Sequence, residues 1–126
     1  MIKEEFSDGE LFKLGRKYDI LQGIPNQINI KYKIKSISCG DYHSCTLSED
    51  GILYTWGGGG ESYNKGQCGH GTTKDVQKPK KVEFFIKNNI KIKNVFCGGY
   101  HTIVIADSNE LFSFGNYYFD LYLHFF

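Results

Sequence analysis

The chain has 126 residues, a length that allows one domain, and its formal net charge is +1. A charge so close to zero gives no electrostatic reason to expect binding to nucleic acid or to an acidic surface. The start of the chain lacks an apolar stretch of signal-peptide length, and the aromatic C-terminal stretch is interrupted by Asp120 and His124. We therefore expect a soluble intracellular protein, cytoplasmic or nuclear, that does not enter a membrane.

The first recognisable element is a short motif in residues 8–15, which read DGELFKLG. The motif returns as DGILYTWG in residues 50–57 and as SNELFSFG in residues 108–115. An Asp-Gly pair favours a hairpin because glycine adopts positive φ without a Cβ clash. Asn109 stands at the position of Gly51, and asparagine is among the residues that best tolerate this conformation. Each copy is therefore expected to form a hairpin.

A longer repeat surrounds the last two copies. Residues 39–57 read CGDYHSCTLSEDGILYTWG and residues 97–115 read CGGYHTIVIADSNELFSFG, a fixed spacing of 58 residues. A fixed period of this size is typical of repeat proteins, in which each unit must stack on a neighbour to bury its apolar face. We expect units of approximately 1–33, 34–91 and 92–126, with the first and last incomplete.

The second unit predicts three short strands separated by turns, over residues 34–39, 43–47 and 52–56. A weaker fourth strand is expected over residues 80–85. No helix is expected, because residues 84–89 carry no capping residue. Three or four short antiparallel strands per unit describe a propeller blade, so the predicted class is all-β, an incomplete β-propeller.

Four motifs follow one another in the second unit: GDYH at 40–43, DGILYTWG at 50–57, GQCGHG at 66–71 and PKKV at 79–82. Their order resembles the repeat of the regulator of chromosome condensation family, and the resemblance covers most of residues 8–115. It implies propellers of about seven blades, of which this chain would hold about two repeats. The WD dipeptide and the later tryptophan of a kelch blade are absent, so those propeller types are less favoured.

Residues that recur at fixed repeat positions are interpreted as the framework of the blade. The histidine of G-x-x-H is expected to hydrogen-bond the backbone, and the large residue shared by Leu14, Trp56 and Phe114 is expected to pack between blades. The predicted framework positions are Gly40, His43, Gly51, Trp56, Gly57, Gly66, Gln67, Gly69, Pro79, Gly98, His101 and Gly115.

Cysteine and histidine residues also suggest a zinc site, which we consider and reject. The candidate ligands are Cys39, His43, Cys68, His70, Cys97 and His101. A tetrahedral site needs four ligands that converge, whereas equivalent residues of successive blades do not meet. We expect reduced structural thiols and no metal. No catalytic constellation and no cofactor site are expected.

Two further segments have a functional and a structural interpretation. The glycines at 57–60 suggest a phosphate-binding loop, but Lys65 precedes Gly66 rather than Ser or Thr and no helix follows, so a flexible loop is favoured. The lysines around Pro79, at 78–81, suggest a nuclear import signal. We favour an edge strand, where charge prevents unwanted pairing.

The resemblance implies a binding surface rather than chemistry. The leading hypothesis is a protein-interaction module that belongs to a larger propeller protein, because the chain begins inside one unit and ends inside another. The alternatives are guanine-nucleotide exchange on a Ran-type small GTPase with chromatin binding, and substrate recruitment for a HECT-type ubiquitin ligase. A protein partner is expected, possible chromatin binding has no support from the charge, and no small-molecule substrate is expected. Specificity is expected in the segment that does not recur, residues 58–78.

Overall fold

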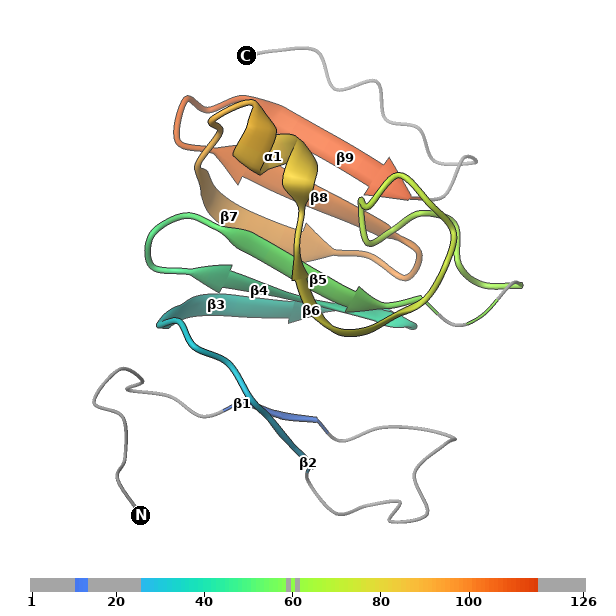
Figure 1. Ribbon diagram of the computed structural model, residues 1–126. Helices are drawn as coiled ribbons and strands as arrows, with labels where there is room; N and C mark the ends of the chain where they lie inside the picture. Colours follow the sequence, from blue (N-terminus) through green and yellow to red (C-terminus); the bar gives the residue numbers. More distant parts are fainter. Residues whose placement is uncertain (1–10, 14–25, 59, 61, 116–126) are drawn as a thin grey trace, which may run out of the picture. The chain divides into compact units, whose positions relative to one another are not determined.

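The computed structural model describes residues 11–13, 26–58, 60 and 62–115 (Figure 1). The chain divides into two compact units, residues 1–33 and 34–126, and each is considered by itself. In the part of the chain that the structure describes, no helix is long and apolar enough to cross a membrane.

Within its described residues, the first unit contains one antiparallel strand pair, β1 (Leu11–Lys13) with β2 (Asn26–Ile28). Phe12 pairs with Gln27. In the second unit, the residues at the same repeat positions, Tyr54 and Lys81, also pair. The first copy therefore reproduces the strand register of the second. The remainder of the motif at 8–15 lies outside the described residues.

The second unit begins with a four-stranded antiparallel sheet. Its strands are β3 (Ile34–Cys39), β4 (His43–Ser48), β5 (Leu53–Gly57) and β6 (Val76–Lys81), and they neighbour one another in chain order. Chain-order pairing through short turns is the meander of a propeller blade. The first three strands lie where the sequence predicts them.

A second antiparallel sheet follows, made of β7 (Ile92–Cys97), β8 (His101–Ala106) and β9 (Leu111–Gly115). It repeats the first sheet residue by residue. The pairing of β4 with β5 starts at His43 and Gly57, and that of β8 with β9 starts at the equivalent His101 and Gly115. The 58-residue period of the sequence is thus a period of strand register.

The hairpin turns confirm the turn chemistry expected from the sequence. Gly51 has φ of 83° and Asn109, its equivalent, has φ of 69°. Both residues occupy the left-handed region, which glycine and asparagine tolerate best. The hairpin therefore has the same turn in both copies, although one carries glycine and the other asparagine.

The prediction of a strand over residues 80–85 and of no helix is wrong. Strand β6 ends at Lys81, and α1 (Glu83–Lys87) follows it. The helix has no side-chain N-cap, so local sequence does not explain it. The Phe85 ring is 3% exposed and packs edge-on against Phe112 of β9, with ring centroids 5.3 Å apart. Burial against the second sheet, invisible in the local pattern, favours the helix.

A shared apolar core holds the two sheets of the second unit together. Strand β7 lies against β3 and β4, so the sheets face each other (Figure 1). The apolar side chains of the core come from both sheets and from the segment around α1: Cys45, Leu47, Leu53, Val82, Phe85, Ile92, Val95, Val104 and Ala106. Neither sheet encloses this core alone, as expected for stacked repeats.

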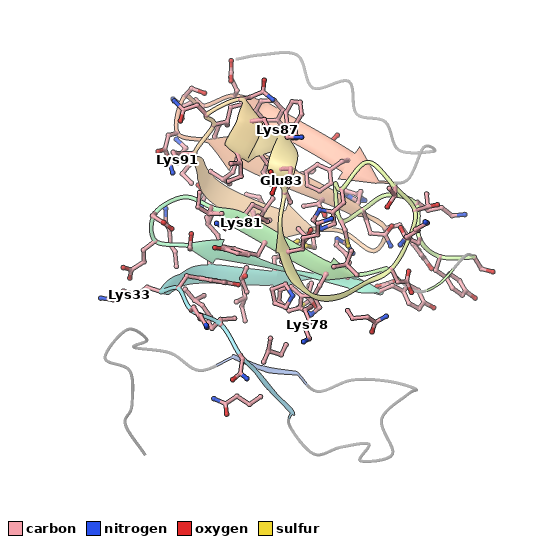
Figure 2. The ribbon with its side chains drawn as sticks, viewed as in Figure 1. Lys33, Lys78, Lys81, Glu83, Lys87 and Lys91 are labelled. Atoms are coloured by element: carbon pink, nitrogen blue, oxygen red, sulfur yellow. The ribbon has the colours of Figure 1, made fainter. Side chains whose placement is uncertain are left out.

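The outer strand β6 carries the lysines that the sequence analysis assigned to an edge. It is the last strand of its sheet, and Lys78, Lys80 and Lys81 are exposed along it. Figure 2 labels Lys78 and Lys81. Charged side chains on an outer strand oppose pairing with another chain. The structure confirms the edge-strand interpretation of this segment.

One pair of equivalent residues isolates the contribution of the contact between sheets. Val95 on β7 is 7% exposed because it faces the first sheet, whereas Ile37, at the same position of β3, is 58% exposed. Val95→Ala should lower the free energy of unfolding by about 2 kcal/mol, because it removes buried methyl groups and leaves a cavity.

The matched control is Ile37→Ala, which should change the free energy of unfolding by less than about 0.5 kcal/mol. Urea unfolding of both variants measures the difference. Equal losses at the two positions would contradict face-to-face packing of the sheets.

Candidate functional site

The G-x-x-H motif has a steric explanation. The His43 ring folds back over Gly40, so a Cβ at residue 40 would lie 2.3 Å from His43 Cε1. In the second sheet a Cβ at Gly98 would lie 2.1 Å from His101 Cε1. Any side chain at either glycine would displace the ring. The spacing of glycine and histidine is therefore a packing requirement.

His43 links the two sheets, but not through the backbone as the sequence analysis expected. Its Nε2 lies 2.8 Å from the hydroxyl oxygen of Thr102 on β8. The Thr102 hydroxyl donates its single proton to the Gln67 carbonyl at 2.7 Å. His43 Nε2 must therefore be the donor toward Thr102. The other nitrogen, His43 Nδ1, is buried without a hydrogen-bond partner.

Gln67 organises the loop between β5 and β6. Its side chain is fully buried. The amide nitrogen donates to the carbonyl oxygens of Gly58 at 3.2 Å and Tyr63 at 3.0 Å, and the amide oxygen accepts from Lys65 N–H at 2.6 Å. The glutamine of the G-Q-x-G motif thus satisfies backbone groups that the loop would otherwise bury unpaired.

A second polar centre holds the glycine-rich part of the same loop. The Asp75 carboxylate accepts from Gly60 N–H at 2.8 Å and from the Asn64 side-chain amide at 2.9 Å. Asn64 is 3% exposed, and its carbonyl oxygen accepts from Gly66 N–H at 3.1 Å. The described part of this loop is held by these hydrogen bonds, and its expected flexibility stays a prediction.

Other framework positions lie in the loop between β5 and β6 or in the strands themselves. A Cβ at Gly69 would lie 2.7 Å from the Phe114 ring. The absence of a side chain at Gly69 therefore leaves room for this aromatic ring of the second sheet. Trp56 is 5% exposed, Pro79 lies in β6, and Gly115 ends β9. Leu14 lies outside the described residues.

Of the six zinc ligands considered from the sequence, Cys39, Cys68 and His70 do not belong to the group of ligands that forms around His43, and they have other contacts. Cys39 is exposed beside Ser44, and Cys68 is buried beside the Gly57 carbonyl. His70 Nε2 lies 2.8 Å from the Thr55 hydroxyl, and burial lowers the pKa of its imidazole.

Within the described residues, two of these six, His43 and Cys97, converge with a third residue, Cys45. His43, Cys45 and Cys97 place one ligand atom each within 4.8 Å of the others. Cys45 was not among the ligands considered from the sequence because it is not a recurring cysteine: Ile103 occupies its position in the next unit.

A cluster of three tyrosines lies where three connections meet. Tyr42 and Tyr63 stack with ring centroids 4.5 Å apart and an interplanar angle of 14°. Tyr100 lies 5.7 Å from Tyr42 and 6.3 Å from Tyr63. Tyr63 is 44% exposed, and the other two are partly buried. We call Tyr42, Tyr63 and Tyr100 the tyrosine cluster.

The folding of both sheets brings these rings together. Tyr42 and Tyr100 occupy equivalent turns, β3–β4 and β7–β8, and Asp41 N–H donates to the Gly99 carbonyl at 3.0 Å between those turns. Tyr63 comes from the loop that Gln67 holds. The cluster combines two recurring residues with one from the non-recurring segment 58–78. The sequence pointed to that segment but not to the cluster.

The strand register and face-to-face packing define two neighbouring blades of a β-propeller. The sequence model of the regulator of chromosome condensation (RCC1) repeat matches residues 50–105. Among curated proteins, human RCC1 domain-containing protein 1 is 39% identical over 69 residues, which is 55% of this chain and 17% of that protein. The ultraviolet-B receptor UVR8 of Arabidopsis thaliana is 31% identical over 101 residues, 80% of this chain and 22% of the receptor.

Solved structures agree. Yeast RCC1 (Prp20), in its complex with Kap60, superposes with a TM-score of 0.60 at 27% identity, covering 72% of this chain and 22% of that one. Human WBSCR16 superposes with a TM-score of 0.65 at 21% identity, covering 86% and 30%, and shows the fold alone. Residues 50–105 therefore form a repeat of the regulator of chromosome condensation type. The chain spans about a fifth of the length of the two curated relatives described.

The role assigned to Gln67 predicts a large effect of its removal. Gln67→Ala should lower the free energy of unfolding by about 2–4 kcal/mol, because it leaves buried backbone groups unpaired. Gln77 on β6 is exposed, so Gln77→Ala is the matched control and should change it by less than about 0.5 kcal/mol. Thermal or urea unfolding checks both values. A Gln67→Ala variant as stable as the control would refute the assigned role.

Proposed function

We propose that the chain is a non-catalytic protein-interaction module whose tyrosine cluster contacts a protein partner. The observation that carries the proposal is the stacking of Tyr42, Tyr63 and Tyr100 at one group of connections, with Tyr63 44% exposed. Tyrosine is enriched in protein interfaces and among the residues that dominate binding energy. Loops held by a rigid sheet scaffold are the usual location of binding residues in propellers.

The relatives support a protein as partner. One structural report describes the binding of yeast Prp20p to Gsp1p and histones, and another shows yeast RCC1 bound to Kap60. A non-catalytic role fits the hydrogen bonds of His43 and His70. His43 is committed to Thr102 and His70 to Thr55, so both serve the framework.

Two more specific functions are alternatives to this proposal. Similarity to yeast RCC1 favours nucleotide exchange on a Ran-type GTPase. A chain with this activity would accelerate nucleotide release from such a GTPase. The probable E3 ubiquitin-protein ligase HERC6 of human is 38% identical over 80 residues, 63% of this chain and 7% of HERC6. Substrate recruitment to a ligase would instead show as ubiquitination of the bound partner.

The proposal predicts loss of binding when the cluster is disrupted. The immobilised chain should retain a defined set of proteins from an extract of its source cells, measured by quantitative mass spectrometry. Tyr63→Ser should reduce retention of at least one of them by about tenfold or more, the effect expected of a hot-spot aromatic.

Phe96→Ser is the matched control, because Phe96 on β7 is an exposed aromatic residue, 53% exposed, outside the cluster. It should leave retention unchanged. The proposal fails if Tyr63→Ser and the wild-type chain retain the same proteins in the same amounts, or if Phe96→Ser loses them equally.

A further inference from the structure

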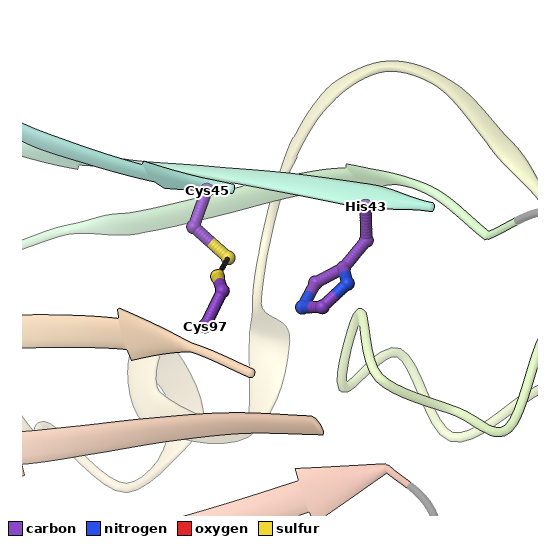
Figure 3. A group of neighbouring side chains, drawn as sticks. All are labelled: His43, Cys45 and Cys97. Atoms are coloured by element: carbon purple, nitrogen blue, oxygen red, sulfur yellow. Dashed lines mark hydrogen bonds between the residues drawn. The ribbon is translucent and has the colours of Figure 1, made fainter. Parts of the chain in front are cut away.

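Two cysteines from different blades face each other in the contact between the sheets. Cys45 lies in β4 and Cys97 is the last residue of β7, and their sulfur atoms are 3.3 Å apart (Figure 3). Cys45 is fully buried, whereas Cys97 is partly exposed. Their positions are 52 residues apart and are not repeat equivalents, so the contact exists only in the folded pair of blades.

We propose that Cys45 and Cys97 form a redox-active dithiol, which hydrogen peroxide oxidises to a reversible disulfide between the two blades. The proposal is independent of any partner of the tyrosine cluster. It assigns Cys97 as the thiol that reacts first and Cys45 as the thiol that resolves the intermediate.

The distance between the sulfur atoms suits this reaction. A disulfide bond is about 2.05 Å long, so the two sulfurs must approach by about 1.3 Å. Cys45 sits in the middle of a strand, whereas Cys97 adjoins the Gly98–Gly99 turn. The movement that brings the two sulfur atoms together therefore takes place at the end of β7, where the chain leaves the sheet.

The environment distinguishes the two thiols. The sulfur atoms of Cys45 and Cys97 share a hydrogen bond, and this contact lowers the pKa of Cys97. The same bond to Cys97, together with burial, raises the pKa of Cys45. The thiolate is the reactive form of cysteine, so the partly exposed Cys97 is the nucleophile.

The reaction balances with peroxide as the oxidant. The Cys97 thiolate attacks one peroxide oxygen, the O–O bond breaks, and the leaving hydroxide takes a proton to become water. The Cys45 sulfur then attacks the sulfur of the resulting Cys97 sulfenic acid. The S–O bond breaks, its oxygen takes the Cys45 proton, and a second water leaves. Two thiols and one peroxide give one disulfide and two waters.

A metal ion is the competing use of the same residues, because one ring nitrogen of His43 also points toward the sulfurs (Figure 3). Two thiolates bound to tetrahedral zinc at about 2.3 Å lie roughly 3.8 Å apart, farther than the 3.3 Å found. The group supplies three ligands, and His43 Nε2 donates to Thr102. These features favour oxidation over metal binding.

The chain contains four cysteines, and the other two are internal controls. Cys39 occupies the repeat position of Cys97 but lies beside the Ser44 hydroxyl, at 3.7 Å. Cys68 lies beside the Gly57 carbonyl, and burial raises the pKa of its thiol to about 11. We expect both to stay reduced under conditions that oxidise the pair.

The test is oxidation of the reduced wild-type chain with a small excess of hydrogen peroxide. Titratable thiols in the unfolded product should fall from four to two, and the intact mass should fall by about 2 Da, the loss of two hydrogens. Peptide mapping without reduction should show one linkage, Cys45 to Cys97, and dithiothreitol should restore all thiols. Cys39→Ser and Cys68→Ser should react as the wild type, and Cys97→Ser should not lose thiols in pairs.

The peptide map of the wild-type chain identifies the disulfide partners even if the Cys97→Ser variant does not fold. Three results would overturn the proposal. They are a different disulfide pairing, conversion of Cys97 to sulfinic acid with Cys45 still free, and stoichiometric zinc in the purified chain that protects both thiols.

Discussion

The contact between the two sheets is the constraint on which the rest of the second unit depends. Each sheet has one apolar face, and the core that joins them draws Leu47 and Leu53 from one sheet and Val104 from the other. The Thr102 hydroxyl supplies the polar part of this contact, since it accepts from His43 and donates to the Gln67 carbonyl. One side chain of the second blade thereby fixes both a strand and a loop of the first. A buried group that satisfies two partners at once is expensive to remove.

This contact also determines what the surface presents. The loop that Gln67 holds carries Tyr63, and the equivalent turns of the two blades carry Tyr42 and Tyr100. Their stacking is therefore a consequence of blade packing rather than of any one segment. The same packing brings the Cys45 sulfur against the Cys97 sulfur. Binding surface and thiol pair both exist only where two blades meet, which is the general property of repeat proteins that use the junctions between units.

Much of the blade could be predicted from the sequence, because periodic spacing reports strand register directly. The turn at Asn109 followed from its equivalence to Gly51, and β6 was recognised as an edge from its lysines. The features that the sequence did not predict share one cause, which is packing between residues far apart in the chain. Helix α1 forms because Phe85 packs on Phe112 of the other sheet, and no local signal encodes that contact. The convergence of Cys45 and Cys97 was missed for the same reason, since comparing equivalent positions cannot show which non-equivalent positions face each other.

A double-mutant cycle between His43 and Thr102 tests the packing of the blades most directly. His43→Phe keeps a ring over Gly40 without the donor, and Thr102→Val keeps the shape of the side chain without the hydroxyl. Urea unfolding of the two single variants and the double variant gives their coupling energy. The structure predicts a coupling of about 1 kcal/mol or more across the two sheets. Additive losses, within about 0.5 kcal/mol, would show that the two residues do not interact and would contradict the contact between the blades.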